Sequence, residues 1–134
     1  MITSLRLRLW LFVAGLSGAC AVASEAFARH GLDAQADAYA IQLVNIASKY
    51  QGLYAVLLIL ILLLGEHIIG ARFARGAILT AGWAFTAGLV LFCGVLEALA
   101  LGAPPSLTPI DPIGGTAFIL GWLALAVAGL IGNR

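Results

Sequence analysis

Long apolar runs constrain this chain more than any other feature of its sequence. Four stretches approach the length that crosses a membrane, namely residues 9–28, 50–64, 77–101 and 113–131. A transmembrane helix needs about 20 mainly apolar residues, because the hydrocarbon core is about 30 Å thick and each helical residue rises about 1.5 Å. Since unpaired backbone polar groups are costly in hydrocarbon, such runs must form helices. The sequence therefore predicts an all-α, integral membrane four-helix bundle.

The composition agrees with a chain embedded in lipid. Of its 134 residues, 63% are hydrophobic and 10% are charged, and the mean hydropathy is +1.08. Soluble domains are roughly 45–50% apolar and about 25% charged, so the excess apolar surface must face lipid or a large partner. The formal net charge of +1 offers no basic surface for phosphates. We therefore expect the lipid bilayer as the surroundings and no nucleic acid as a partner.

The connections between the spans differ in character. Four prolines between residues 104 and 112 make a continuous helix from the third span to the fourth unfavourable. Residues 33–49 instead place apolar side chains at helical spacing opposite polar ones, and Asp33 is a good helix cap. This pattern predicts an extra amphipathic helix between the first and second spans. The start of the second span, near Tyr50, is open, because the semi-apolar residues before it could lengthen that helix.

The distribution of Lys and Arg predicts the orientation in the membrane. Five lie on one side of the predicted spans (Arg6, Arg8, Arg72, Arg75 and Arg134) and two lie on the other (Arg29 and Lys49). Because positive residues favour the cytoplasmic side, we expect both termini in the cytoplasm. The lack of a Ser-rich transit-type presequence favours the bacterial inner membrane.

The N-terminus has a second interpretation, as a cleaved secretory signal. Arg6 and Arg8 precede an apolar run that reaches a small-residue pattern at residues 21–23, and residues 17–20 faintly resemble a lipoprotein box. Cleavage would leave three spans. The apolar run continues past Ala23, which favours a retained first helix.

Both cysteines, Cys20 and Cys93, lie inside apolar runs. We expect them to be small core residues rather than a disulfide, because each would sit within a helix in lipid.

Two carboxylates inside the predicted spans need an explanation. A charged side chain costs at least about 2.5–3.5 kcal/mol at the centre of a transmembrane helix. Glu25 and Glu97 both lie toward the outer ends of helices that run in the same direction, so they should reach similar depth. Arg29, His30 and Lys49 cluster there as well. These five residues form the candidate polar site.

Three interpretations of this polar site remain open. Glu25 and Arg29 are four residues apart with the acid first, which favours a neutralising ion pair on one helix. Alternatively, Glu25 and Glu97 accept protons or cations, with His30 as a titrating neighbour. In the third, one carboxylate pairs with a residue of another protein.

Small residues at four-residue spacing predict close helix packing, within the chain or between chains. Such residues let helix backbones approach where lipid removes the hydrophobic drive for association. In the first span they are Gly15, Ala19 and Ala23, and in the third they include Gly88 and Gly94. In the last they include Gly121, and Gly114 and Gly115 should let that helix begin tightly against a neighbour.

The three tryptophans are expected in two settings. Trp10 lies near the cytoplasmic interface, where indole rings are favoured. Trp83 and Trp122 lie deeper, so they are expected to pack within the bundle or against a partner.

Three short motifs, in order along nearly the whole chain, carry a family resemblance. His30-Gly31-Leu32 follows the first span, Tyr50-Gln51 opens the second, and Pro112-Ile113-Gly114-Gly115 opens the last. On these residues the chain resembles the domain of unknown function 423 family of small inner-membrane proteins, which includes transmembrane protein 256 of animals. The resemblance implies the fold and carries no activity, because none is established for the family.

The chain departs from the family pattern at several positions. Glu25 and Ala28 stand where the family usually has glycine, and Arg29 stands where it has alanine. Tyr54 lies near a common histidine, and Glu97 near a usual aromatic or apolar residue. An ordinary member would carry neither membrane carboxylate, so the polar site is not implied by the resemblance.

The sequence predicts no enzyme. It contains no Ser, His and acid trio and no reactive cysteine arrangement. The metal-ligating spacings His-x-x-x-His and Cys-x-x-Cys are absent, so no metal or other cofactor is expected. We expect a non-enzymatic accessory or assembly subunit of a larger membrane complex, with a membrane protein partner or a homo-oligomer. The alternative is a small proton- or solute-coupled transporter that uses Glu25 and Glu97.

Overall fold

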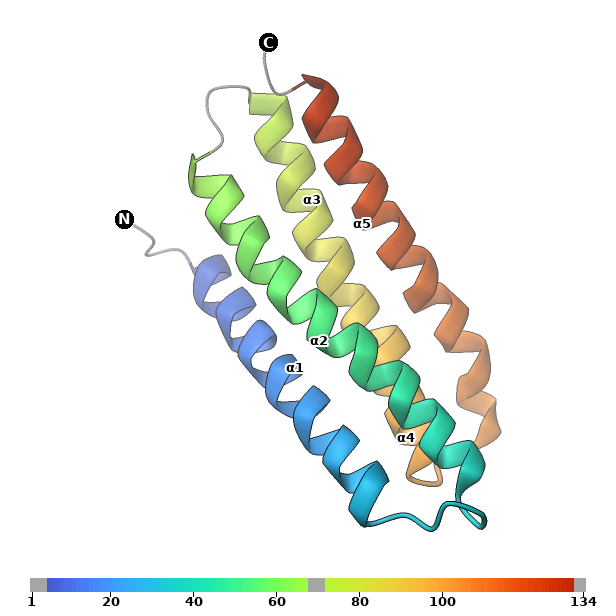
Figure 1. Ribbon diagram of the computed structural model, residues 1–134. Coiled ribbons are helices and arrows are strands. Elements are labelled where there is room, and N and C mark those ends of the chain that lie inside the picture. The colour runs from blue at the N-terminus through green and yellow to red at the C-terminus, as the bar shows by residue number, and fades with distance from the viewer. Residues whose placement is uncertain (1–4, 68–71, 132–134) are drawn as a thin grey trace.

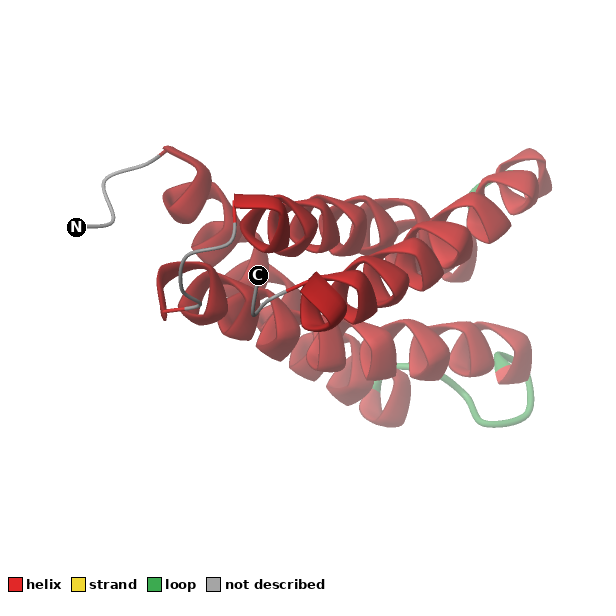
Figure 2. Cartoon of the chain, turned by 90° about the horizontal axis from the view of Figure 1, so that it is seen from above, coloured by secondary structure: helices red, strands yellow, loops and turns green. Residues whose placement is uncertain are grey.

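The computed structural model describes residues 5–67 and 72–131, which contain helices and short loops but no strand (Figures 1 and 2). The α-helices are α1 (Leu5–His30), α2 (Ala38–His67), α3 (Arg72–Gly88), α4 (Gly94–Ala100) and α5 (Asp111–Ile131). A π-helical turn, η1 (Leu89–Cys93), joins α3 to α4, and a 3-10 helix, η2 (Pro105–Ile110), leads into α5.

Four helical stretches are long and apolar enough to cross a membrane. They are Leu5–His30, Ala38–Gly65, Arg72–Ala100 and Pro105–Ile131. The predicted all-helical fold with four membrane-type spans is therefore confirmed.

Successive spans run antiparallel, so the start of α1 and the end of α5 lie at the same end of the bundle (Figure 1). The turn after α1 and the loop between α4 and α5 lie at the opposite end. α1 packs mainly on α2, and α3 packs mainly on α5. Contacts of α2 with α3, η1 and α4 join the two pairs.

The amphipathic helix predicted over residues 33–49 is not a separate element. Residues 34–37 form a turn, and α2 then runs from Ala38 through the second span to His67 without a break. The helix continues because residues 38–50 contain no proline or glycine, and because Leu43, Val44 and Ala47 are buried in the bundle. The amphipathic segment is therefore the first part of the second span.

Asp33 caps the turn that precedes α2. Its carboxylate accepts hydrogen bonds from the backbone N–H groups of Gln35, at 2.9 Å, and Ala36, at 2.8 Å. The backbone N–H of Asp33 in turn donates to the carboxylate of Asp37 at 2.8 Å. These reciprocal bonds satisfy donors that an open helix start would leave unpaired.

The third span ends in a glycine-dependent turn before the prolines. Gly102 has a φ of 97°, a left-handed conformation that glycine adopts without steric cost. The backbone N–H of Ala103 donates to the carbonyl of Ala98 at 2.9 Å, and that of Gly102 donates to Leu99 at 3.1 Å. This pattern is the Schellman motif, and the 3-10 turn η2 follows it in place of an α-helix.

Aromatic rings seated on glycines form the closest contacts between the helices. A Cβ at Gly88 would collide with the ring of Phe118, and a Cβ at Gly121 would collide with the ring of Phe85. These two reciprocal contacts join α3 to α5. The ring of Trp10 lies against Gly82 in the same way and joins α1 to α3.

Gly114 lies against the backbone of the π-helical turn. A Cβ there would collide with the backbone of Leu91 and Phe92, so this contact involves main chain rather than a movable side chain. π-helical turns widen a helix locally. The absence of a side chain at Gly114 lets α5 approach the widened segment.

Six aromatic side chains form a cluster around these glycine contacts. The rings of Tyr54 and Phe118 stack with centroids 3.8 Å apart. The indole N–H of Trp122 donates a hydrogen bond of 2.7 Å to the hydroxyl of Tyr54. The cluster consists of Tyr50, Tyr54, Phe85, Phe92, Phe118 and Trp122.

The structure places the predicted packing residues in two different settings. Gly88, Gly114 and Gly121 lie at the tight contacts just described, and Gly115 is 3.8 Å from the ring of Phe92, measured from a Cβ built on the glycine. Gly94 is exposed.

The small-residue row of α1 does not face the bundle. Gly15, Ala19 and Ala23 are all exposed. The buried residues of α1 are Trp10, Ala14, Ala21 and Ala28, a row with a different phase. Spacing alone could not decide between the two rows, because Ala14, Ala21 and Ala28 are also small residues at helical intervals.

Trp10 is a core residue, with only 1% of its surface exposed. Its ring meets that of Trp83 edge-on, with centroids 5.4 Å apart. Although Trp10 is near the start of its helix, it packs within the bundle and does not face the lipid interface.

The Gly114 contact predicts a large effect of a small substitution. Gly114→Ala should lower the free energy of unfolding by about 1–3 kcal/mol, because the added methyl group overpacks a contact with main chain. Gly129→Ala is the matched control, because a Cβ at Gly129 meets no atom within 4 Å. Thermal unfolding of both variants in detergent measures the difference. Equal midpoints for the two variants would contradict the proposed tight contact.

Candidate functional site

The two ends of the bundle differ in charge. Arg6, Arg8, Arg72 and Arg75 lie where α1 and α3 begin, and we call this the arginine end. The opposite end, which we call the acidic end, carries two cations, Arg29 and Lys49, and five carboxylates. The carboxylates are Glu25, Asp33, Asp37, Glu97 and Asp111. All five residues of the predicted polar site thus lie toward the acidic end.

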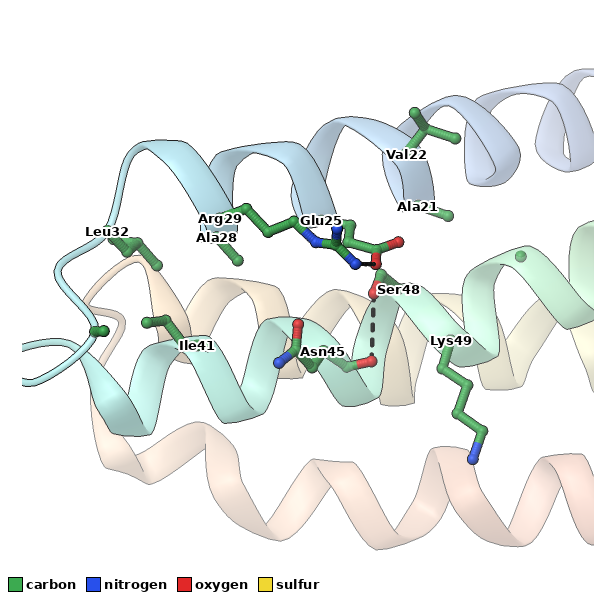
Figure 3. Close-up of a pocket in the computed structure, with 12 residues that line it drawn as sticks. Ala21, Val22, Glu25, Ala28, Arg29, Leu32, Ile41, Asn45, Ser48 and Lys49 are labelled. Atoms are coloured by element: carbon green, nitrogen blue, oxygen red, sulfur yellow. Dashed lines mark hydrogen bonds and ion pairs between the residues drawn. The ribbon is translucent and has the colours of Figure 1, made fainter.

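Glu25 and Arg29 form an ion pair on the surface of α1 (Figure 3). An Nη atom of Arg29 lies 2.9 Å from an Oε atom of Glu25. The side chains are 71% and 50% exposed for Arg29 and Glu25, respectively. Exposed pairs at this spacing contribute only about 0.3–0.5 kcal/mol to helix stability. The two groups are therefore accessible, and little free energy holds them together.

Glu97 has a different partner. The hydroxyl of Ser24 donates a hydrogen bond of 2.8 Å to its carboxylate and links α1 to α4 in a partly buried position. The two residues line a cleft of about 240 Å³ with apolar side chains that include Phe27, Val44 and Leu101. This contact places Glu97 level with Ser24, and so at the depth of the neighbouring Glu25.

The two membrane carboxylates nevertheless belong to separate sites. Successive residues of an α-helix are about 100° apart around the axis, so Ser24 and Glu25 face different sides of α1. Glu97 lines the cleft between α1 and α4, whereas Glu25 lines a groove between α1 and α2. The structure therefore places Glu25 and Glu97 at one level without bringing them together.

His30 and Lys49 lie near this region but make no ion pair with Glu25. His30 is the last residue of α1 and is exposed. The amine of Lys49 points away from α1 and from the Glu25–Arg29 pair (Figure 3). Among the side chains described, those of residues 5–65 and 72–131, Arg29 and Glu25 form the one ion pair.

The space between α1 and α2, which we call the α1–α2 groove, has a volume of about 680 Å³. Glu25 and Arg29 line it from α1, and Asn45, Ser48 and the stem of Lys49 line it from α2 (Figure 3). The hydroxyl of Ser48 donates to the carbonyl of Asn45 at 3.3 Å. Small and aliphatic residues complete the wall, namely Ala21, Val22, Ala28, Leu32, Ala34, Ile41 and Gly52. The groove thus combines opposite charges with an apolar surface.

The Asp33 turn adds fixed negative charge at the acidic end. Hydrogen bonds from the backbone N–H groups of Ala36 and Gln35 hold the pKa of the Asp33 carboxyl below its usual value. Because hydrogen bonds to the ionised form favour it, this carboxylate stays charged under ordinary conditions.

Several polar groups of this region were not predicted as part of the polar site. Ser24 binds Glu97, and Asn45 lines the groove that also contains Glu25. In the sequence, Ser24 could have been noticed as a polar residue beside Glu25 within an apolar run. Gln51 is buried, and its side-chain carbonyl has no hydrogen-bond partner among the described residues. The sequence marked Gln51 as unusual, because it is the one amide side chain within the second predicted span, residues 50–64.

The two cysteines are not joined in a disulfide. Cys20 and Cys93 are free thiols. Among the described side chains, residues 5–65 and 72–131, no three from His, Cys, Asp or Glu are grouped so that they could hold a metal ion.

Comparison with known proteins gives the family. The family model described as "Protein of unknown function (DUF423)" matches residues 24–115, which include Glu25, Arg29, Glu97, the Tyr50-Gln51 motif within α2 and the motif at the start of α5. The chain belongs to the DUF423 family. This DUF423 member matches no solved structure.

Curated relatives of this DUF423 member are bacterial membrane proteins. It is 30% identical over 122 residues to the UPF0382 membrane protein YwdK of Bacillus subtilis, covering 91% of this chain and 96% of the relative. It is 35% identical over 117 residues to a UPF0382 membrane protein of Haemophilus influenzae, covering 87% and 90%. It is also 31% identical over 123 residues to the UPF0382 membrane protein SAB0533 of Staphylococcus aureus, covering 91% and 95%. The chain is therefore a multi-pass membrane protein of a family whose function is unknown.

Proposed function

We propose that this DUF423 member is a non-enzymatic accessory or assembly subunit of a larger membrane protein complex, or a homo-oligomer. The outward face of α1 carries this proposal. In the apolar window of α1, 17% of residues are buried, against 44% in the span Arg72–Ala100. Gly15, Ala19 and Ala23 lie on the exposed face, and a Cβ at Gly15 meets no atom within 4 Å.

α1 is suited to two helical neighbours. Its buried row, Ala14, Ala21 and Ala28, is already used within the bundle, where a Cβ at Gly52 of α2 lies 3.9 Å from the Cβ of Ala21. In lipid, small residues favour helix association because they permit close backbone contact and van der Waals packing. The second small-residue row therefore offers a contact surface to a helix of another subunit.

The large apolar side chains that fill the bundle core support a role without catalysis. The largest fully buried side chains are Trp10, Leu58, Ile61, Ile78, Phe85 and Cys93. These side chains bring no paired nucleophile and base together. A packed apolar core suits a scaffold better than a reaction site.

The charge difference between the ends supports an orientation in the bacterial inner membrane. The arginine end would face the cytoplasm under the positive-inside rule, which places the start of α1 and the end of α5 there. The acidic end would then face the opposite side of the membrane.

Filling the exposed row of α1 should remove the partner without unfolding the protein. Gly15→Leu should lower the amount of partner recovered after mild solubilisation and crosslinking by roughly tenfold, corresponding to about 1.4 kcal/mol. The fold should persist because the site is open. Gly129→Leu, on the exposed surface of α5, is the matched control and should retain the partner.

Solubilisation and crosslinking of the wild-type protein test the subunit proposal itself. A protein that runs alone as a monomer in mild detergent, with nothing attached after gentle crosslinking, would refute the subunit proposal. Equal loss of the partner in Gly15→Leu and Gly129→Leu would refute the assignment to α1.

A second candidate function, a small proton-coupled carrier, rests on the Ser24–Glu97 contact. A half-buried carboxylate within a membrane-spanning helix is costly and often marks an ion or proton path. Glu97 lines its own cleft, and its partner Ser24 is uncharged.

The carrier candidate makes a selective prediction for the two carboxylates. In vesicles with an internal pH indicator, Glu97→Gln should abolish the proton flux, because the amide cannot exchange a proton. Glu25→Gln should retain the flux, since Glu25 lines a different groove. Unchanged flux in Glu97→Gln, or no flux in the wild type, would dismiss the carrier.

A further inference from the structure

We infer that the α1–α2 groove binds the head group of a zwitterionic phospholipid with a primary ammonium group, of the phosphatidylethanolamine type. This inference is independent of the proposed subunit role. It rests on the depth of the groove, on the arrangement of its charges and on its apolar wall.

The depth of the groove matches the head-group layer. α1 has 26 residues, so its length of about 39 Å exceeds the hydrocarbon thickness of about 30 Å. Glu25 and Arg29 occupy the last two turns of this helix, and the Asp33 turn follows directly. Arg29 therefore lies in the head-group layer, and Glu25, about one turn earlier, lies at the inner edge of that layer.

The charges of the groove complement a phosphoethanolamine group. That head group places an ammonium two carbons from a phosphate ester, so it presents both charges within one short unit. Glu25 and Arg29 are an opposite pair 2.9 Å apart, and each side chain is at least half exposed. The Arg29 guanidinium suits the phosphate, because its planar donors bind two oxygens at once. The Glu25 carboxylate suits the ammonium, because it accepts N–H hydrogen bonds.

The α2 side of the groove supplies further polar groups and a place for an acyl chain. The exposed Asn45 amide lies across from the ion pair, and the Ser48 hydroxyl, which is buried and donates to the Asn45 carbonyl, lies beside it (Figure 3). Deeper along the helices, Ala21, Val22 and Gly52 line the groove with small and apolar surface. A lipid tail fits this surface, whereas a free phosphate ester would leave it uncovered.

Lipid binding to the full-length protein tests this inference. The purified, delipidated protein is titrated in mixed micelles with phosphatidylethanolamine, phosphatidylcholine or phosphatidylglycerol, and bound lipid is counted by native mass spectrometry. Phosphatidylethanolamine should bind roughly tenfold more tightly than the other two, because it alone supplies ammonium N–H donors to a charged acceptor. Equal binding of the three lipids would overturn the inference.

Substitutions at the two exposed positions assign the binding to the groove. Arg29→Gln should weaken phosphatidylethanolamine binding by roughly tenfold, since it removes the charged donor to the phosphate. Glu25→Gln should remove the preference over phosphatidylcholine. Arg75→Gln, an equivalent loss of an exposed cation at the arginine end, should change neither quantity. A preference that persists in Glu25→Gln, or an equal loss in Arg29→Gln and Arg75→Gln, would overturn the assignment.

Soluble phosphoethanolamine distinguishes the lipid from a free phosphate ester. Failure of this compound to displace the bound lipid at millimolar concentration would support the lipid assignment, whereas complete displacement would overturn it. Circular dichroism checks the helical fold of each variant. If a variant does not fold, the comparison of the three lipids on the wild-type protein decides the question.

Discussion

Close contact between helix surfaces is the interaction on which this bundle depends. Lipid tails are as apolar as the helices, so the hydrophobic effect does little to hold the spans together. Aromatic rings seated on glycines supply the contact area instead, and Phe118 on Gly88 and Phe85 on Gly121 join α3 to α5. Gly114 adds a contact between main-chain segments at the π-helical turn. The rest of the aromatic cluster packs around these points.

The polar groups follow from the same surroundings. Charges are tolerated near the helix ends, and most of the arginines lie at one end of the bundle whereas most of the carboxylates lie at the other. α1 combines two features that the core does not use. Its small-residue row faces outward, and its last two turns carry the Glu25–Arg29 pair on the wall of a groove. The subunit proposal and the lipid-binding proposal therefore both place function on α1, the least buried of the four spans, which the other helices support.

Much of the fold could be predicted from hydropathy, because spanning length and apolar content are properties of the local sequence. The start of α2 could not be predicted from hydropathy, since it depends on burial of Leu43, Val44 and Ala47 in the bundle. For the polar site, the shared depth of Glu25 and Glu97 was predictable from helix direction. The placement of these two carboxylates in separate clefts was not predictable, because it depends on the rotation of α1 about its own axis.

Labelling with a membrane-impermeant thiol reagent tests the four-span arrangement most directly. In a background with Cys20→Ala and Cys93→Ala, single cysteines are placed at Ala34 in the turn after α1, at Ser106 in the loop before α5 and at Gly76 near the arginine end. The account predicts that Ala34→Cys and Ser106→Cys react in intact cells, and that Gly76→Cys reacts only after the membrane is opened. Reaction of Ala34→Cys and Ser106→Cys from opposite compartments would contradict it.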